Sequence, residues 1–492
     1  MAIVYSQSNK GVSVLVDDQS IALSTNQLKT RFIVQAITER GVINEPYDVN
    51  NVLDFERRLG KAISNAGFEI LRGLATNNCT FTVFPVHHST AGTLQGTKAT
   101  IDLASGVTIN AKTVGSGYNG VTVAVTAPLS GKADVFDITV SLAGAITQTV
   151  FDVPETLDTD KVDELNQTFE LVDFDISGGA TLAVETVTLA GGAKDVSLVT
   201  HQDYINGVAS FSKVKSFAPR MLQLHPAANI DDAFVAYAKQ TNRTVHLFVP
   251  TSVTSKANYQ AYRRRTTPYT GSKIDSFHAR LVGGGLKVKH PYNANRTIQL
   301  LGGGDVAGAV GAKDRVGEFL AAAQSNFGTF SNAVDVVINF EGDDYNDLNA
   351  EGLNLITNTD GLIRYDGNNT LHVDRTSNLK IENVADNIIG MQRYLFVLGQ
   401  KYKYRQNTQI DLWQPMYQEG RLFFDDLLNR RAIYAYRWNG DQDAQTLADL
   451  QYNVPAEITS GIYRVQVIVQ PTPAAEQITI TITNVSGNVT IS

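Results

Sequence analysis

The sequence predicts a multidomain protein of the α/β plus β class. Its 492 residues are too many for a single hydrophobic core. Hydrophobic residues make up 43% of the chain, which is enough to form several cores. Helix-like and strand-like patterns alternate in residues 29–95 and again from residue 197 onward, which is typical of α/β domains. Between them, residues 96–196 are rich in Thr, Val, Gly and Ala and hold short strand-like runs between turn residues, as in an inserted β-sandwich.

The first 95 residues divide into an arm and an α/β segment. Residues 1–28 contain one strand-like run, Val12 to Val16, and are predicted to form an extended N-terminal arm that is too thin to fold alone. Residues 29–95 begin with the strand "RFIVQAI" and end with the strand "TFTVFPV". Between these strands we predict a helix whose apolar residues have near-helical spacing: Leu53, Phe55, Leu59, Ile63 and Ile70.

Residues 197–376 are predicted to form the central α/β domain. The stretch "NIDDAFVAYAKQTNRTVHLFVP" predicts a helix that Asn229 caps, followed by a buried strand. The run "AVDVVINF" predicts another strand, and the acidic stretch "EGDDYNDLNAEG" predicts a solvated loop.

Residues 377–475 are predicted to form an α+β C-terminal core domain, and residues 476–492 a C-terminal strand arm. One helix should run from Val384 to about Tyr404. A second, "EGRLFFDDLLNRRAI", places Asp426 and Arg430 one turn apart, where their charges attract. Its predicted apolar side consists of Leu422, Phe423, Leu427 and Leu428.

The composition excludes several classes of partner. A net charge of −8 argues against nucleic acid, whose binding proteins normally carry a basic surface. No run of about 18 apolar residues occurs, so we expect no membrane insertion. The N-terminus lacks the pattern of a signal peptide, and the single cysteine, Cys79, rules out an intrachain disulfide framework. These features favour a protein that folds and stays soluble in a cytoplasm.

The segment "LGGGDVAGAVGAKDR" (301–315) has glycines and a lysine, as a phosphate-binding loop does. A P-loop requires Gly-Lys followed by Ser or Thr, whereas this chain has Ala312-Lys313-Asp314, and an aspartate there would repel a phosphate. The dinucleotide pattern fits only in its looser form, with Gly302, Gly304 and Ala307. We therefore predict no cofactor and interpret the glycines as a tight turn where backbones approach closely.

No catalytic or metal site is predicted. His87 and His88 are adjacent at a strand end and would point to opposite faces, which makes a poor chelate. The acidic stretch has Asp347, Asn349, Glu351 and Gly352 at EF-hand-like positions, but its twelfth position is Asn358 instead of the bidentate Glu, and it lacks a helix on both sides. Weak ion binding near Asp343 to Glu351 is therefore the lesser alternative to a solvated loop. The Gly-x-Ser-x-Gly motif of hydrolases is missing, and we predict that the chain is not an enzyme.

Three consecutive arginines, Arg263, Arg264 and Arg265, stand out in a chain with excess acid. They could bind an anion, but we expect them to contact carboxylates of a neighbouring subunit. Such partly exposed contacts contribute about 0.2–1 kcal/mol each.

The order of these segments resembles that of the tail sheath proteins of contractile bacteriophages and related injection systems. "GVINEPYDVNNVLDFERRLG" is similar to the family's loop and helix after the first strand, and "SGYNGVTVAV" with "FDITVSLAGAITQTVFDVP" to its β-sandwich insertion. "LGGGDVAGAVGAKDR" resembles its glycine-rich turn, and "NAEGLNLITNTDGLIRYDGNNTL" a segment with a Gly-Asn-Arg-Thr-like turn. "NVPAEITSGIYRVQVIVQPTPAAEQITITI" resembles its closing strands, so the resemblance covers roughly residues 29 to 482.

The resemblance implies a subtilisin-like α/β domain without a catalytic triad and a C-terminal domain against a tail tube. It implies a structural subunit that polymerises around the tube and contracts to drive it through the host envelope. Its partners would be copies of itself, the tail tube protein, and baseplate and tail terminator proteins, in a virion tail assembled in the host cytoplasm. The alternatives are a hydrolase of subtilisin-like fold and a surface adhesin with an Ig-like domain.

Two sets of residues follow for that function. The tube-facing candidates lie on the second C-terminal helix and are Arg421, Asp425, Arg430 and Arg431, unless that helix is buried on both sides. The candidates for strand exchange between subunits alternate with polar residues, as strand residues on a core do: Val12, Val14, Val16, Ile478, Ile480 and Ile482. The pattern alone is equally consistent with a hairpin of 462–470 with 478–483 in one chain, and the resemblance favours exchange.

Overall fold

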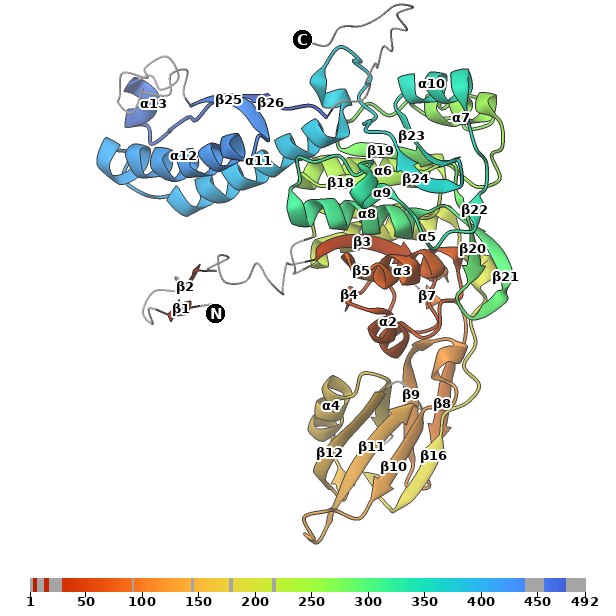
Figure 1. Ribbon diagram of the computed structural model, residues 1–492. Coiled ribbons are helices and arrows are strands. Elements are labelled where there is room, and N and C mark those ends of the chain that lie inside the picture. Colours follow the sequence, from red (N-terminus) through yellow and green to blue (C-terminus); the bar gives the residue numbers. More distant parts are fainter. Residues whose placement is uncertain are drawn as a thin grey trace, which may run out of the picture. The chain divides into compact units, whose positions relative to one another are not determined.

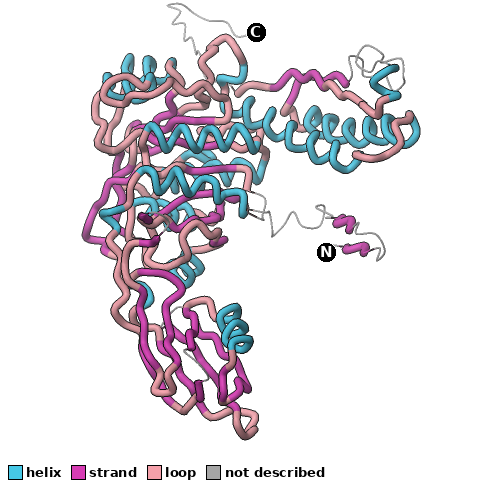
Figure 2. Tube along the Cα trace, turned by 180° about the vertical axis from the view of Figure 1, so that it is seen from behind, coloured by secondary structure: helices cyan, strands magenta, loops and turns pink. Residues whose placement is uncertain are grey.

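In the computed structural model, the described residues are 3–6, 13–16, 29–90, 93–142, 146–176, 180–214, 218–438 and 455–474. The chain divides into two compact units (Figures 1 and 2). The larger unit spans Met1–Gly317 and Ala322–Arg375, and the C-terminal unit spans Glu318–Ala321 and Thr376–Ser492. The structure is mixed α/β with several separate sheets.

One eight-stranded sheet forms the centre of the larger unit, with helices on both of its faces (Figure 1). Its order is β24-β23-β19-β18-β17-β3-β5-β4, and all neighbours are parallel except the edge pairs β4–β5 and β23–β24. The inner strands are almost wholly buried, which is why they read as continuous apolar runs. The strands are β3 (Thr30–Ala36), β4 (Tyr47–Val49), β5 (Cys79–Pro85), β17 (Arg220–Leu222), β18 (Thr244–Phe248), β19 (Ala279–Gly283), β23 (Leu353–Thr359) and β24 (Leu362–Asp366).

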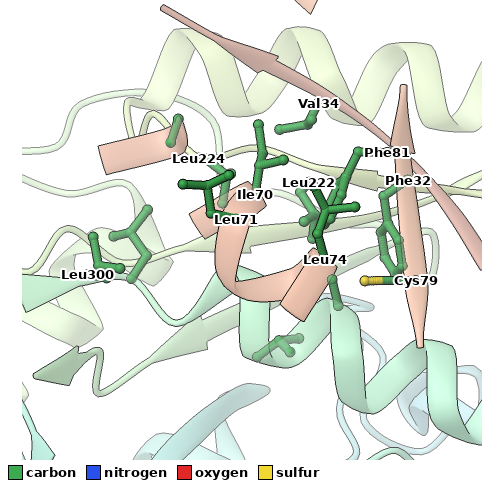
Figure 3. Close-up of a cluster of buried hydrophobic side chains, with 14 of the residues drawn as sticks. Phe32, Val34, Ile70, Leu71, Leu74, Cys79, Phe81, Leu222, Leu224 and Leu300 are labelled. Carbon is green, nitrogen blue, oxygen red and sulfur yellow. The ribbon is translucent and has the colours of Figure 1, made fainter. Parts of the chain in front are cut away.

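Successive residues of these strands point to opposite faces and so contribute to two separate cores. Phe32 and Leu222 belong to the first core, whose side chains converge in Figure 3. Their neighbours Ile33 and Met221 belong to the second. The first core includes residues of helices α3 (Asn65–Ala75) and α8 (Gly303–Val316). The second includes residues of α5 (His201–Val208), α6 (Ala228–Thr241) and α7 (Lys256–Arg264).

The single helix predicted around Leu53 to Ile70 is in fact two helices, α2 (Val52–Leu59) and α3. Asn51 caps α2 and Ser64 caps α3, and each side chain accepts a hydrogen bond from the backbone N–H three residues on. Gly60 ends α2 at a φ of +82°. Apolar spacing did not reveal this break, because both helices contribute side chains to the first core.

Three other local predictions were wrong. Asn229 does not cap α6, because the helix begins one residue before it. The acidic stretch is not a loop but helix α10 (Gly342–Ala350), with acidic residues in its first turn, where the helix dipole favours them. "AVDVVINF" contributes only the short strand β22 (Asp335–Val336), which lies outside the central sheet.

Residues 96–196, called the inserted unit from here on, hold two antiparallel sheets and a core of their own (Figure 1). The sheet orders are β12-β11-β10-β16 and β14-β9-β8, and alternate residues such as Ile109 and Val123 point into the shared core. The strands are β8 (Lys98–Asp102), β9 (Val107–Val114), β10 (Thr122–Thr126), β11 (Val135–Leu142), β12 (Ile146–Pro154), β14 (Val172–Ile176) and β16 (Glu185–Thr188). Helix α4 (Thr159–Thr168) and the short pair β13 (Thr156–Leu157) with β15 (Ala180–Thr181) complete it.

Several small elements complete the larger unit. A three-stranded sheet has the order β21-β20-β22, and two hairpins pair β6 with β7 and β1 with β2. The N-terminal region thus has two strands where one was predicted. The bounds are β1 (Ile3–Ser6), β2 (Ser13–Val16), β6 (Ser89–Thr90), β7 (Thr93–Leu94), β20 (Leu286–His290), β21 (Asn293–Leu300) and α9 (Ser325–Gly328).

The C-terminal unit packs two long helices and two antiparallel strands around a small aromatic core. The predicted helix from Val384 to about Tyr404 is confirmed within two residues at each end. The elements are α11 (Glu382–Tyr402), α12 (Gln414–Asn429), β25 (Ile433–Trp438), α13 (Pro455–Thr459) and β26 (Val467–Pro471). Phe424 and Trp438 are almost fully buried in the core.

The apolar side predicted for α12 was partly wrong. Leu422 is 72% exposed, and only Leu427 of the four predicted residues is buried. The helix begins at Gln414, five residues before the predicted start, and its buried side follows a different helical phase. The buried residues are Met416, Tyr417, Gly420, Phe424 and Leu427.

Candidate functional site

The glycine-rich segment forms the N-terminus of α8, and an anion from the chain itself occupies that terminus. Gly302 lies at φ +86° before the first turn. The backbone N–H groups of Gly302 and Gly304 donate to the two carboxylate oxygens of Glu69, each at 2.8 Å. Unpaired N–H groups and the helix dipole make such a terminus an anion site. Glu69 thus lies where a phosphate would bind.

The Glu69 carboxyl is fully buried, and opposing effects act on its pKa. Burial raises the pKa to about 7, because it disfavours the charged form. The hydrogen bonds from Gly304 and Gly302 and the charge of Arg72 act in the opposite direction. The group therefore titrates near neutral pH in the folded chain.

The glycines also bring α3 and α8 into close contact. A Cβ atom on Gly304 would lie 2.0 Å from the carbonyl oxygen of Glu69, and one on Gly73 would lie 3.1 Å from the carbonyl oxygen of Gly304. Beside this contact, Arg72 on α3 and Asp305 on α8 form a two-pronged ion pair with both distances at 2.8 Å. The interpretation of the glycines as residues of close backbone packing is confirmed.

The central sheet has a topological switch point between β3 and β17, because the chain continues to opposite sides from these two strands. In α/β proteins, ligands bind at the carboxyl ends of the strands at such a point. Here the side chain of Gln35, at the end of β3, donates to the backbone carbonyl of Tyr204 on α5 at 3.0 Å. The Tyr204 hydroxyl in turn hydrogen-bonds Nε2 of His225, which follows β17.

Burial lowers the pKa of His225 to about 4, so its ring is neutral near pH 7. The two rings are 4.0 Å apart between centroids. Side chains of α5 and of the strand ends therefore occupy the place where a ligand would bind in other α/β proteins.

The predicted contact of Arg263 and Arg265 with a neighbouring subunit conflicts with their burial. Arg263 is 3% exposed and donates to the carbonyl oxygens of Ile274 and Leu371 at 3.0 and 3.2 Å. Arg265 is 5% exposed and pairs with the buried Asp231 at 2.6 Å. Their guanidinium groups are engaged within the chain, so they tie α7 to the strands and loops around it.

Arg264 differs from its neighbours. Its side chain is 52% exposed and binds Glu351 of the same chain, with Nε 3.1 Å from a carboxylate oxygen. A contact of Arg264 with another subunit stays a prediction.

The buried Asp231 is the centre of a closed polar network. It accepts hydrogen bonds from Arg265, from the Tyr262 hydroxyl at 2.8 Å and from the Gln223 amide at 2.6 Å. Burial raises the pKa of Asp231 to about 6, and the charge of Arg265 is the largest effect that opposes this shift. These bonds satisfy a carboxylate that would otherwise destabilise the second core.

The other candidate ligands have partners within the chain. On α10, Asp344 and Asp347 bind the same ammonium group of Lys256, at 2.9 and 2.5 Å. His88 binds Asp203 at 3.0 Å, and His87 binds a backbone carbonyl. Among the described residues, no group of three or more His, Cys, Asp or Glu is placed to hold a metal ion.

The second C-terminal helix, α12, is buried on one side only, so the alternative of burial on both sides was wrong. Arg421 is exposed and forms an ion pair with Asp425 at 3.2 Å. Asp425 also accepts a hydrogen bond from the Tyr436 hydroxyl at 2.6 Å. Arg430 lies over the Phe319 ring and 3.6 Å from Asp426, the pairing that the sequence predicted. Arg431 is exposed at the end of the helix. Contact of this side with a tube stays a prediction.

The strand-exchange candidates lie only in part among the described residues. Val14 and Val16 are in β2, opposite Tyr5 and Ile3 of β1 in the same chain. Val12, Ile478, Ile480 and Ile482 lie outside the described residues. The two-stranded sheet of β25 and β26 is described, and each of its strands has one neighbour there.

The fold defined by these elements matches that of solved tail sheath proteins. The chain is similar to the sheath tail protein of Listeria innocua, with a TM-score of 0.58 and 16% identity over 82% of this chain and 86% of that one. It is similar to the sheath tail protein of Desulfitobacterium hafniense, with a TM-score of 0.54 and 17% identity over 83% and 88%. The anti-feeding prophage helical sheath in its contracted state gives a TM-score of 0.54 and 12% identity over 92% and 93%.

No family model and no curated protein matches the sequence. The likeness therefore concerns three-dimensional structure: the chain has the fold of contractile tail sheath proteins, and its resemblance to that family is supported. Among the helices that the structure describes, none is both long and apolar enough to span a bilayer.

Sequence reasoning missed the role of Glu69. One signal for its burial was present in the sequence. Glu69 is the only carboxylate of the helix "NAGFEILRGLA", and its neighbours on that helix are mostly apolar. A buried acid implies a nearby donor. The glycine-rich N-terminus of α8 is that donor, and it lies 233 residues away in the sequence.

Proposed function

We propose that this chain is a structural subunit of a contractile bacteriophage tail sheath. It polymerises helically around a tail tube, and the polymer later shortens to drive the tube through a bacterial envelope. The observation that supports this most is the extent of the fold likeness to the three sheath proteins, which covers 82–92% of this chain and so includes both units.

The proposed domain layout follows from the central sheet of the larger unit and from the separate core of residues 96–196. Residues 29–95 and 197–376 contribute strands to one central sheet, which suits a subtilisin-like domain without a triad. Residues 96–196 have a separate core, which suits an inserted β-sandwich at the periphery of the polymer. Residues 377–475 are the core domain next to the tube, and residues 1–28 and 476–492 are the arms.

The arms are proposed to link subunits by adding strands to the sheet of β25 and β26. A sheet of only two strands is marginally stable in water, so further strands would stabilise it. Main-chain hydrogen bonds do not depend on the orientation of the rest of the donor subunit. Such a link can therefore persist while the subunits rotate during contraction.

The exposed side of α12 is the proposed tube contact. Its charged residues would make a polar contact that can be released as the sheath slides. The further proposed partners are other copies of the chain, the tail tube protein, and baseplate and terminator proteins in the tail of a virion assembled in the host cytoplasm. The energy for contraction would come from more favourable subunit contacts in the shortened state, and no enzymatic activity is involved.

Electron microscopy of the purified full chain tests this proposal, because a sheath subunit should form hollow striated cylinders. Removal of residues 1–20, or of those after Pro473, should leave soluble monomers that form no cylinders. Cylinders of normal stability from both truncated proteins would contradict the strand linkage alone. Absence of cylinders from the full chain, together with covalent labelling by a serine-directed probe, would favour the hydrolase alternative.

A further inference from the structure

The negative charge of the chain is concentrated in the inserted unit. Residues 96–196 contain 14 Asp and Glu, 5 Lys and no Arg, which gives a net charge of −9. The other residues contain 35 acidic and 36 basic side chains, a net charge of +1. The rest of the chain is therefore nearly neutral, and the excess of acidic residues lies in this unit.

Within the sheets of the inserted unit, the solvent-accessible carboxylates lie on the edge strands. The inner strands β9 and β10 contain no acidic residue, and Asp137 on β11 is only 3% exposed. The acidic residues of the edge strands β8, β12, β14 and β16 are Asp102, Asp152, Asp173, Asp175 and Glu185. Charged side chains at sheet edges oppose pairing with the edge of another molecule.

The same unit has features that would otherwise favour self-association. Four large apolar side chains are exposed among its described residues: Leu129 by 85%, Val184 by 66%, Phe151 by 58% and Val196 by 42%. Phe151 lies next to a bulge in β12, where the register with β11 shifts, and Asp152 has a φ of +54°. Exposed apolar residues beside open strand edges can template pairing with a second copy.

We propose that the carboxylates of the inserted unit prevent the inserted units of different copies from pairing through their sheet edges. This inference rests on the proposed function for its setting, because a helical polymer brings many copies of the unit close together. Like charges repel over about 10 Å at 0.1 M salt, so the repulsion acts when two inserted units approach within that distance. The repulsion keeps the units separate within one cylinder and keeps different cylinders dispersed.

A charge variant of the full chain tests the inference. Asp160, Asp163 and Asp175 are exposed, and their side chains take part in no hydrogen bond or ion pair among the described residues. Replacing them in the triple variant D160N/D163N/D175N changes the inserted unit from −9 to −6. The product of the charges of two such units then falls by more than half, while side-chain size is conserved.

The matched control is D232N/D343N/D360N. These aspartates are also exposed but lie outside the inserted unit, so both variants change the net charge of the chain from −8 to −5. Sedimentation and light scattering are measured from 0.01 to 1 M NaCl, where the screening length falls from about 30 to about 3 Å. Electron microscopy then shows whether cylinders lie side by side.

At low salt, the D160N/D163N/D175N protein should sediment several-fold more than the wild type or the control, and its cylinders should bundle. At high salt, where the repulsion is screened, the wild type and the control should sediment and bundle as the D160N/D163N/D175N protein does at low salt. Equal sedimentation of the two variants at every salt concentration would overturn the inference. Light scattering of unassembled chains reports the same repulsion, so a failure to form cylinders would contradict the proposed function and leave this test intact.

Discussion

The helix pair α3–α8 in the larger unit and the pair α11–α12 in the C-terminal unit differ in what they leave exposed. At the first pair, glycines allow backbone contact, and the charges of Arg72 and Asp305 neutralise each other. At the second, Tyr394 and Phe423 stack with 3.7 Å between ring centroids. Large apolar side chains on the outer sides remain exposed there, by 65–72%: Phe396, Val397 and Leu422.

This difference separates two physical roles. In the larger unit, the buried carboxyl groups of Asp231 and Glu69 have hydrogen-bond partners within the same chain. The C-terminal unit has a small core and, among its described residues, a two-stranded sheet, and sheets of two strands are marginally stable alone. If the proposed function is right, the larger unit would act as a rigid body and the C-terminal unit as the joint between subunits.

The two units can be followed separately in unfolding experiments. Both tryptophans, Trp413 and Trp438, lie in the C-terminal unit. Tryptophan fluorescence therefore reports on that unit alone, and far-UV circular dichroism reports on the whole chain.

The largest effect is expected from Arg265→Met. Removing the charge leaves Asp231 buried and unpaired, which should cost about 3–5 kcal/mol of the unfolding free energy of the larger unit. The circular dichroism transition should move to much lower urea, and the tryptophan transition should stay in place. Arg264→Met, one residue away but exposed, is the control and should cost no more than about 1 kcal/mol. Equal losses in the two variants would contradict the burial contrast between these arginines.

Gly304→Ala should have the next largest effect. The added methyl group would lie 2.0 Å from a backbone oxygen of α3, so the two helices must separate, at a cost of about 1–3 kcal/mol. Gly399→Ala on α11 is the matched control, because a Cβ atom there meets nothing within 4 Å. It should stabilise the C-terminal unit by about 0.5–1 kcal/mol, seen in the tryptophan transition. A destabilised Gly399→Ala protein would show that α11 is less open than described.

A pH dependence is expected from Glu69. Folding raises the pKa of Glu69 from 4.5 to about 7, so its carboxyl group binds a proton more tightly in the folded chain than in the unfolded chain. This stabilising contribution is complete below about pH 4.5 and is lost as pH rises through 7.

The Glu69→Gln protein should lose that part of the pH dependence of the circular dichroism transition. It should also be less stable by about 1–3 kcal/mol, because an amide accepts from only one of the two backbone N–H groups. The pH dependence that remains should include Asp231, whose pKa is raised in the same direction. An unchanged slope between pH 5 and 7 would contradict the role of Glu69.

The alternation of helices and strands could be read from the sequence, because buried parallel strands and amphipathic helices leave local patterns. The strand "RFIVQAI" and the helix from Val384 are examples. The burial of Arg265 could not be read in this way, since its partner is 34 residues away and reached only in the folded chain. Glu69 and the N-terminus of α8 are separated even further.

Local patterns also failed to predict the buried side of a helix where its apolar residues fit more than one helical phase. The apolar residues of α12 allow more than one helical phase, and the choice of Gly420 and Phe424 for the buried side depends on Trp438. A Cβ atom on Gly420 would lie 2.4 Å from that indole ring, so the ring packs directly on the helix backbone. No feature of the helix sequence alone encodes this contact.

The smallest effect on stability is expected from replacing Arg430 and Arg431 together by Ser. Arg430 is 44% exposed, and its pairing with Asp426 is long, so the tryptophan transition should change by less than about 1 kcal/mol.

The larger consequence of replacing Arg430 and Arg431 should be in assembly, because the proposed tube contact loses two positive charges. Cylinders should still form from the purified variant, and they should retain less tail tube protein on sedimentation, most clearly at low salt, where unscreened charges act over the longest distance. The matched control replaces Arg57 and Arg58 on α2, which are similarly exposed and pair with Asp54, and removes the same charge from the larger unit. Equal retention of tube by the two double variants would place the tube contact elsewhere than on the exposed side of α12.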